Sequence, residues 1–403
     1  MFLRRLSVLV SGTAIAQLVN FAFLPVLTRL YKPEAFADLA VVVVVSLLAS
    51  LLMTVRYEVA IILPKSMVRS KKIALLSLFI ATIIFIALNL VVNFIFHDEW
   101  PLKVSVFVAY FLALINIGTN VSIKSGRFGV IAVSKLVQVF VTIALQLFLL
   151  FLFGGSESLV YGYAGGLLAS AIYISFISRK AYNESLSRQD VISLVSKYKQ
   201  FPLFNATQAF LNSLSSNLLI FLLKKLFGAF VLGQYSVASR VLQTPMSILS
   251  QSIKQVVLKE FSEESKNYDN LLRLFANRTC FAALVSVIPI LVFVVFSTEI
   301  VVFVLGGEWE VAGTFAKYLA LWLYFVFVSS PATAMIQVVN LQGWFLIYEI
   351  FLAVTRCLLM LYAYIYTIPE ELFIITFSII GALFNMALIV FVYSILRKMR
   401  CSL

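Results

Sequence analysis

A few charged side chains lie inside stretches of sequence that are otherwise almost entirely apolar. The segment TVRYEVAIILPK at 54–65 holds Arg56 and Glu58, and a later apolar stretch holds Glu349 and Arg356. The planar guanidinium of arginine suits phosphate and carboxylate oxygens, and burial can raise the pKa of a carboxyl group toward neutrality. These residue types therefore predict an anion-binding role, ion coupling, or neutralisation of an arginine by a neighbouring carboxylate.

The spacing of these residues limits how they can meet. Residues two apart on an α-helix point about 160° away from each other, so we expect Arg56 and Glu58 to have separate partners. Arg56 then either extends to the aqueous boundary near Lys65 or faces an internal cavity. Glu349 and Arg356 share a helix face but lie two turns apart, which is too far for direct contact and leaves room for a bridging partner.

Polar residues also form stripes along three predicted helices. Polar groups that face lipid are costly, so these stripes should face protein or water. Hydrogen bonding between helices is the alternative for the small residues, whereas two cations in one stripe need water, a counter-charge or an anionic ligand. The stripes are Thr13, Gln17, Asn20 and Thr28, with a kink offered by Pro25; Asn205, Gln208, Asn212, Ser215 and Ser216; and Ser236, Arg240, Gln243, Ser247, Gln251 and Lys254, beside Pro245.

Long apolar segments must position all of these groups. Of the 403 residues, 62% are hydrophobic and 12% are charged, which is too little polarity to cover a water-soluble protein of this length. Backbone groups in lipid must bond internally and no alternating barrel pattern is present, so we expect an all-α integral membrane protein. Twelve transmembrane helices are predicted, at about 6–28, 38–61, 73–96, 102–123, 128–153, 159–178, 203–223, 235–257, 275–297, 313–337, 344–366 and 371–396.

The distribution of lysine and arginine predicts the orientation. If the N-terminus is cytoplasmic, the predicted cytoplasmic segments carry most of the lysine and arginine and the outer segments carry most of the acidic residues. The positive-inside rule then places both termini in the cytoplasm. The formal net charge of +13 is thus mainly a topology feature, and nucleic acid is not an expected partner because no folded basic face is available.

Two weak similarities within the chain indicate an internal repeat. Arg29-Leu30-Tyr31 matches Lys225-Leu226-Phe227, and Glu99-Trp100 matches Glu308-Trp309. They predict two six-helix lobes related by a parallel pseudo-repeat, an arrangement seen in transporters with a central cavity. The predicted N-terminal lobe covers residues 1–178, the basic cytoplasmic linker covers 179–201, and the C-terminal lobe covers 202–403.

At these residues the sequence resembles a known family. FLPVLTRLYKPEAFADL (23–39), VRYEVAIILPK (55–65), FPLFNATQAFLNSLS (201–215), GQYSVASRVLQTP (233–245) and VLGGEWEVAGTFAKYL (304–319) are similar to Wzx-type O-antigen and polysaccharide flippases. These belong to the polysaccharide transporter family of the multidrug/oligosaccharidyl-lipid/polysaccharide (MOP) superfamily. Phe36-Ala37 departs from the Phe-Gly that the family often has. The last two spans match in hydropathy alone, so a role for Arg356 rests on its burial.

The resemblance implies a flippase that moves an undecaprenyl-diphosphate-linked oligosaccharide, an O-antigen or similar surface polysaccharide repeat unit, from the cytoplasmic to the periplasmic leaflet of the bacterial inner membrane. It would work by alternating access, in lipopolysaccharide biosynthesis, with membrane lipid and other polysaccharide assembly proteins as partners. A diphosphate needs cations and a glycan needs amide and hydroxyl groups. The candidate substrate-binding residues in the cavity are Arg29, Arg56, Arg240, Lys225, Lys254, Asn20, Asn212, Gln243 and Gln251, with Arg29, Arg56 and Arg240 assigned to the diphosphate.

Glu58, Glu349 and Arg356 remain as buried charges that either couple ions or pair structurally.

A multidrug exporter of the same superfamily is an alternative, although exporters of organic cations favour an acidic cavity and the predicted spans hold more cations than carboxylates. A membrane glycosyltransferase or O-antigen polymerase is disfavoured because the outer loops are short, and His97 is read as a solvated loop residue. An ATP-driven pump is disfavoured because the sequence has no G-x-x-x-x-G-K-[ST] loop to bind phosphates. We expect no enzyme activity, no cofactor and no metal.

Overall fold

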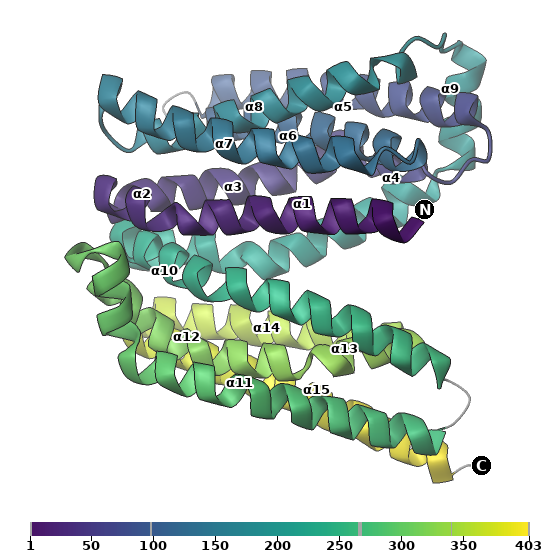
Figure 1. Cartoon of the computed structure of the whole chain (residues 1–403). Coiled ribbons are helices and arrows are strands. Elements are labelled where there is room, and N and C mark those ends of the chain that lie inside the picture. Colours follow the sequence, from purple (N-terminus) through teal and green to yellow (C-terminus); the bar gives the residue numbers. More distant parts are fainter. Residues whose placement is uncertain (1, 97–98, 265–267, 340, 402–403) are drawn as a thin grey trace. The chain divides into compact units, whose positions relative to one another are not determined.

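The computed structural model describes residues 2–96, 99–264, 268–339 and 341–401, and this part of the chain is helical almost throughout, without strands (Figure 1). The all-α membrane class predicted from the sequence is therefore confirmed. The elements are α1 (Phe2–Ala22), α2 (Leu24–Leu30), α3 (Pro33–Thr54), α4 (Tyr57–Ala60), α5 (Met67–Ile95), α6 (Trp100–Lys124), α7 (Phe128–Phe153), α8 (Glu157–Ser178), η1 (Arg179–Ala181), α9 (Arg188–Lys197), η2 (Phe201–Ala206), α10 (Thr207–Glu263), α11 (Tyr268–Leu305), η3 (Gly307–Trp309), α12 (Glu310–Val328), α13 (Ser330–Val338), α14 (Gln342–Tyr366) and α15 (Glu370–Cys401).

Within the described residues, 11 helical segments are long and apolar enough to cross a membrane. One of them, Phe201–Ser247, has 47 residues. A helix of that length would extend about 70 Å, more than twice the ~30 Å hydrocarbon core of a bilayer. Gly228 interrupts it with φ 86° and ψ 179°, which is not a helical conformation. Gly228 thus divides this segment into two parts, which overlap the predicted spans 203–223 and 235–257, so the count of 11 in the described residues lies near the predicted twelve.

The chain divides into two compact units, Met1–Phe221 and Leu222–Leu403. The division falls within α10, whereas the repeat places its boundary at the basic segment 179–201. That segment contains η1 and α9 and belongs to the first unit. The division into repeated lobes predicted from the sequence stays a prediction.

In the first unit, α7 packs along α8 (Figure 1). The contact involves small and polar residues. The Oγ atoms of Ser134 and Ser170 lie 2.7 Å apart across the interface. A Cβ atom on Gly162 would lie 2.6 Å from the backbone nitrogen of Gln146, so only glycine permits this approach. Small residues that let backbones come close are typical of helix packing in membranes.

In the second unit, a buried amide ties α10 to the start of α12. Gln234 is fully buried, and its Nε2 donates to the carbonyl oxygen of Glu308 at 2.7 Å. Its Oε1 accepts from the backbone N–H of Ala312 at 2.9 Å. Trp309, between these two contacts, is also fully buried. A buried amide whose donor and acceptor are both satisfied fixes the relative position of two helices.

Candidate functional site

Two residues in the left-handed backbone region separate α3 from α4. Val55 has φ 47° and ψ 29°, and Arg56 has φ 61° and ψ 13°. A β-branched residue is rarely found in this region, where the strain amounts to about 1–2 kcal/mol per residue. Val55 packs against a buried cluster that includes Tyr57, Ile61 and Ile73. We infer that this packing holds the strained backbone in place.

The break brings Arg56 and Glu58 together. Arg56 Nη1 lies 3.6 Å from Glu58 Oε1. The prediction of separate partners was wrong because it assumed a continuous helix through residue 58, whereas α3 ends at Thr54. The Arg56 side chain is 33% exposed and that of Glu58 is 3% exposed. The pair thus joins a partly solvated cation to a buried carboxyl group.

The surroundings of Glu58 favour its protonated form. Glu58 lies between the spans Pro33–Thr54 and Met67–Ile95. Burial raises the pKa of the Glu58 carboxyl group, while a hydrogen bond with Thr54 and the charge of Arg56 oppose this rise. Glu58 Oε2 and Arg56 Nε are both buried without a hydrogen-bond partner among the described residues. Glu58 is therefore a group that can exchange a proton closer to neutral pH than an ordinary carboxyl group.

A pocket of about 320 Å³ lies within the unit Leu222–Leu403. Three of the candidate residues line it: Lys254 of α10, and Glu349 and Arg356 of α14. Sequence reasoning had placed Lys254 with the substrate-binding residues and the other two with the buried charges. Two cations and one carboxylate in a shared pocket suit an anionic ligand. We call this pocket, with all the residues that line it, the α14 pocket.

Aromatic rings hold the guanidinium of Arg356. Its Cζ lies 5.1 Å from the centroid of the Trp322 ring and 4.5 Å from that of Phe377. A desolvated cation–π contact contributes about 2 kcal/mol. Glu349 is two helical turns away, roughly 10.5 Å along the axis, as the spacing predicts. Arg356 Nε is buried without a hydrogen-bond partner among the described residues, so this cation retains an unsatisfied donor.

Sequence reasoning missed several residues that line the α14 pocket. Ser329 Oγ donates to Asn385 Oδ1 at 2.8 Å, and Asn385 Nδ2 donates to the carbonyl oxygen of Gly381 at 2.8 Å. Both side chains and Trp322 line the pocket. One feature of the sequence could have identified Asn385, because it is an isolated amide in the apolar run IIGALFNMALIV (379–390).

The remaining candidate residues are not among those that line this pocket. Arg29, Asn20 and Asn212 have exposed side chains in the first unit. In the second unit Gln243 and Lys225 are exposed, Arg240 is half-buried, and Lys225 Nζ lies 6.0 Å from the centroid of the Tyr364 ring. The side chain of Gln251 and the whole of His97 lie outside the described residues, so the hypotheses about them stay predictions.

The polar stripe predicted for the first span is divided by a helix break. α1 ends at Ala22, and α2 begins at Leu24 with Pro25 at its first turn. Thr28 is buried and its Oγ1 donates to the carbonyl oxygen of Pro25 at 3.2 Å, whereas Gln17 is exposed. The helix is thus interrupted beside Pro25, as expected, and the shared face of the stripe stays a prediction.

The comparison with known families decides the classification. Residues 26–313, more than two thirds of the chain, match the family described as polysaccharide biosynthesis protein. The chain belongs to this family. The match covers the bend that contains Arg56 and Glu58, whereas Glu349 and Arg356 lie beyond its end. No curated protein sequence matches the chain.

Solved structures of a flippase and of transporters share the fold of this polysaccharide biosynthesis protein. A structure titled lipid II flippase MurJ, in an inward closed conformation, has a TM-score of 0.71 at 16% identity and covers 94% of this chain and 86% of its own. An inward-facing multidrug resistance MATE family transporter has a TM-score of 0.62 at 14% identity and covers 99% of both chains. A MOP superfamily transporter from Pyrococcus furiosus has a TM-score of 0.57 at 13% identity, covering 98% and 95%. These likenesses show that the chain shares the fold of these transporters. The family match confirms the polysaccharide part of the resemblance.

Proposed function

We propose that this protein is a flippase for a lipid-linked oligosaccharide carried on undecaprenyl diphosphate. It moves an O-antigen or similar repeat unit from the cytoplasmic to the periplasmic leaflet of the bacterial inner membrane by alternating access, with both termini cytoplasmic. The observation that carries this proposal is the match of residues 26–313 to the polysaccharide biosynthesis family. The likeness to a structure titled lipid II flippase supports it at the level of the fold.

The chemistry of the charged side chains suits such a substrate. A diphosphate carries concentrated negative charge, and guanidinium groups bind it through paired hydrogen bonds. The α14 pocket offers Lys254 and Arg356, the latter with an unsatisfied buried donor. Arg29 and Arg240 are the further diphosphate candidates, together with Arg56, which remains one third exposed in its contact with Glu58.

The exposed amides are our candidates for glycan contacts. Asn20, Asn212 and Gln243 have exposed side chains that are chemically suited to sugar hydroxyls. For the carboxyl groups two roles stay open. The contact of Glu58 with Arg56 supports neutralisation of that arginine, whereas the position of Glu349 in the α14 pocket keeps ion coupling as its proposed role.

A multidrug exporter is the second candidate function, because several of the similar structures are titled MATE transporters. The charge of the α14 pocket argues against organic cations as substrates, since two cations face one carboxylate there. Binding of a cationic dye to the purified protein, lost in Glu349→Gln, would favour the exporter.

The experiment is a deletion in the native host, in a strain that has no second flippase. Extraction of undecaprenyl-linked saccharides and staining of surface polysaccharide then report the step that fails. A translocation block should remove surface polymer while complete lipid-linked repeat units accumulate. Normal surface polymer in the deletion strain would overturn the proposal.

A further inference from the structure

A second pocket lies among helix ends of the unit Met1–Phe221. It has a volume of about 240 Å³ and is lined by the start of α5, the ends of α6 and α8, and the turns that follow them. Four of its lining residues are basic: Lys71, Lys124, Arg127 and Lys180. Within the described part of the chain no acidic residue lines it. We define these residues as the basic pocket.

Two of the four cations are held by local contacts. Lys71 Nζ lies 2.9 Å from Glu184 Oε1. Lys124 Nζ donates to the carbonyl oxygens of Ile62, at 3.0 Å, and Pro64. An ammonium group has three donors, so Lys124 retains one donor after these two bonds. These contacts hold two lysine side chains at the pocket.

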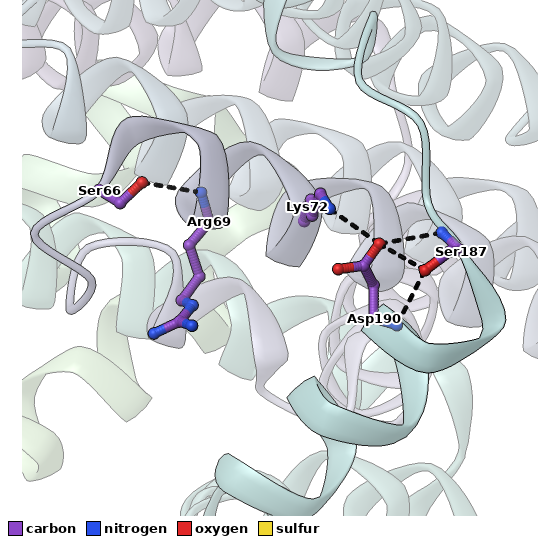
Figure 2. A network of polar contacts seen from close by, with 5 residues as sticks. All are labelled: Ser66, Arg69, Lys72, Ser187 and Asp190. Atoms are coloured by element: carbon purple, nitrogen blue, oxygen red, sulfur yellow. Dashed lines mark hydrogen bonds and ion pairs between the residues drawn. The ribbon is translucent and has the colours of Figure 1, made fainter.

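The segment that contains Glu184 and Asp190 is attached to the start of α5. Lys72 Nζ lies 2.8 Å from Asp190 Oδ2, and this carboxylate also accepts from Ser187, as Figure 2 shows. Asp190 is in the first turn of α9, so the ion pair joins α9 to α5. The basic pocket is therefore bordered by a segment that two ion pairs attach to α5, one through Lys71 and one through Lys72.

The other two cations, Arg127 and Lys180, have exposed side chains at the pocket. The buried residues Ser70, Ser122 and Ser178 also line the pocket, and Ser70 Oγ donates to the carbonyl oxygen of Ser66. Guanidinium and ammonium donors together, without a lining carboxylate, are groups that bind phosphate oxygens.

An exposed apolar stripe leads to this pocket along α8. Leu168, Ile172 and Phe176 recur every four residues and are 40%, 60% and 57% exposed, respectively. Lys180 follows at the same spacing just beyond the end of α8. Residues four apart on a helix share a face. The stripe lies within the candidate span Glu157–Ala181, where an exposed apolar face suits acyl chains.

We propose that the basic pocket binds the phosphate headgroup of an anionic phospholipid, whose acyl chains lie along the Leu168–Ile172–Phe176 stripe. The positive-inside rule places this helix end at the cytoplasmic surface, where anionic lipids attract basic groups. The site is distinct from the residues assigned to the transported substrate, so it stands or falls independently of the proposed function.

The test measures lipid retention by the purified full-length protein with native mass spectrometry. Phosphatidylglycerol and phosphatidylcholine with identical acyl chains compete for the protein. Arg127→Gln/Lys180→Gln removes the two exposed cations, and Lys65→Gln/Arg69→Gln removes the same charge from exposed residues at the same helix end but outside the pocket. A hydrogen bond from a cation to a phosphate oxygen contributes a factor of about ten or more, and only residues in the pocket can make it. We expect the pocket variant to lose about tenfold or more of its preference for phosphatidylglycerol, and the control to retain that preference.

A further variant and two soluble anions distinguish a specific lipid site from general surface charge and from a phosphate-binding site. Arg127→Lys/Lys180→Arg should keep the preference, because it keeps both charges. Equal losses in both glutamine variants, or no preference in the unaltered protein, would overturn the proposal. Inorganic phosphate or pyrophosphate that binds the pocket with no preference between the lipids would also overturn it, since a soluble anion would then be the ligand.

Discussion

The bend at residues 54–60 and the α14 pocket each combine an arginine with a glutamate in an apolar setting, and they do so in opposite ways. At the bend, two consecutive left-handed residues bring Arg56 within 3.6 Å of Glu58. In α14 the helix is unbroken, Glu349 and Arg356 lie seven residues apart, and aromatic rings support the guanidinium. At the bend, a strained backbone brings the two charges into contact. In α14 the two charges stay apart and both line a pocket.

The difference bears on what each region can bind. A cation already 3.6 Å from a carboxylate offers less of its charge to a ligand than one whose guanidinium lies against two aromatic rings. Cation–π contacts leave the N–H donors of a guanidinium available, since the ring faces accept none of them in conventional hydrogen bonds. We therefore expect substitutions at Arg356 to have the larger effect on transport and substitutions at Arg56 to have the larger effect on stability.

The largest expected effect is the loss of transport in Arg356→Met. Methionine fills similar volume and keeps apolar contact with Trp322 and Phe377, so folding should be retained. Charge-assisted contacts contribute roughly 1.5–3 kcal/mol, so transport should fall by at least about tenfold. Surface polysaccharide in a complemented deletion strain measures the loss, and the thermal midpoint of the purified protein measures folding.

The control is Lys317→Met, at an exposed lysine on α12, which should leave both transport and the thermal midpoint unchanged. Full transport in Arg356→Met would remove the α14 pocket from the substrate path.

The next effect concerns the pair at the bend. Arg56→Ala leaves the buried carboxyl group of Glu58 without its cation, and we expect a destabilisation of about 1–2 kcal/mol, reduced from the fully buried case because Arg56 is 33% exposed. Adding Glu58→Gln should recover part of this loss, because a neutral amide no longer needs the cation. A double-mutant cycle on thermal unfolding measures the coupling. Additive effects would show that the two side chains do not interact in the folded protein.

A smaller effect compares the backbones of the two regions directly. Val55→Gly relieves left-handed strain of about 1–2 kcal/mol, while Val354→Gly adds flexibility of roughly 0.5–1 kcal/mol to the unbroken α14. Val354 is 51% exposed, so its side chain contributes little burial. We expect Val55→Gly to be the milder substitution, by roughly 1.5–3 kcal/mol less the packing that Val55 loses, in thermal unfolding. The opposite order would mean that the packing of Val55 outweighs the strain.

Much of the fold could be predicted from the sequence because the bilayer imposes one strong rule. Every long apolar segment had to be a helix, and the spans emerged with nearly correct positions. The family could also be recognised, since its resembling stretches lie within or close to the residues that match the family. Hydropathy and short motifs are local properties, and these two conclusions needed nothing else.

The arrangement of the charged side chains could not be predicted in the same way. Hydropathy gives no indication that the chain leaves the helical region at Val55, so the relation of Arg56 to Glu58 was misjudged. The grouping of Lys254 with Glu349 and Arg356 depends on how α10 packs near α14, which involves residues about a hundred positions apart. Such contacts follow from tertiary packing and leave no periodic pattern in the sequence.

The smallest expected effect is a difference in acid response between two carboxyl groups outside the spans. The hydrogen bond from Lys72, followed by those from Ser187, lowers the pKa of Asp190 to about 2, so its contact stabilises the fold above the ordinary carboxyl pKa of 3.8 and is lost as pH falls from about 4 to about 2. Burial raises the pKa of Glu58, so the folded state binds this proton more tightly than the unfolded state does. Stability therefore decreases as pH rises above 4.5 through that raised pKa.

In thermal unfolding followed across pH, Asp190→Asn should flatten the acid side of the stability profile alone. Glu58→Gln should flatten the region above pH 4.5 alone. If either substitution changes the other's region, the bend and the α9 attachment are coupled, and the comparison of independent charged regions fails.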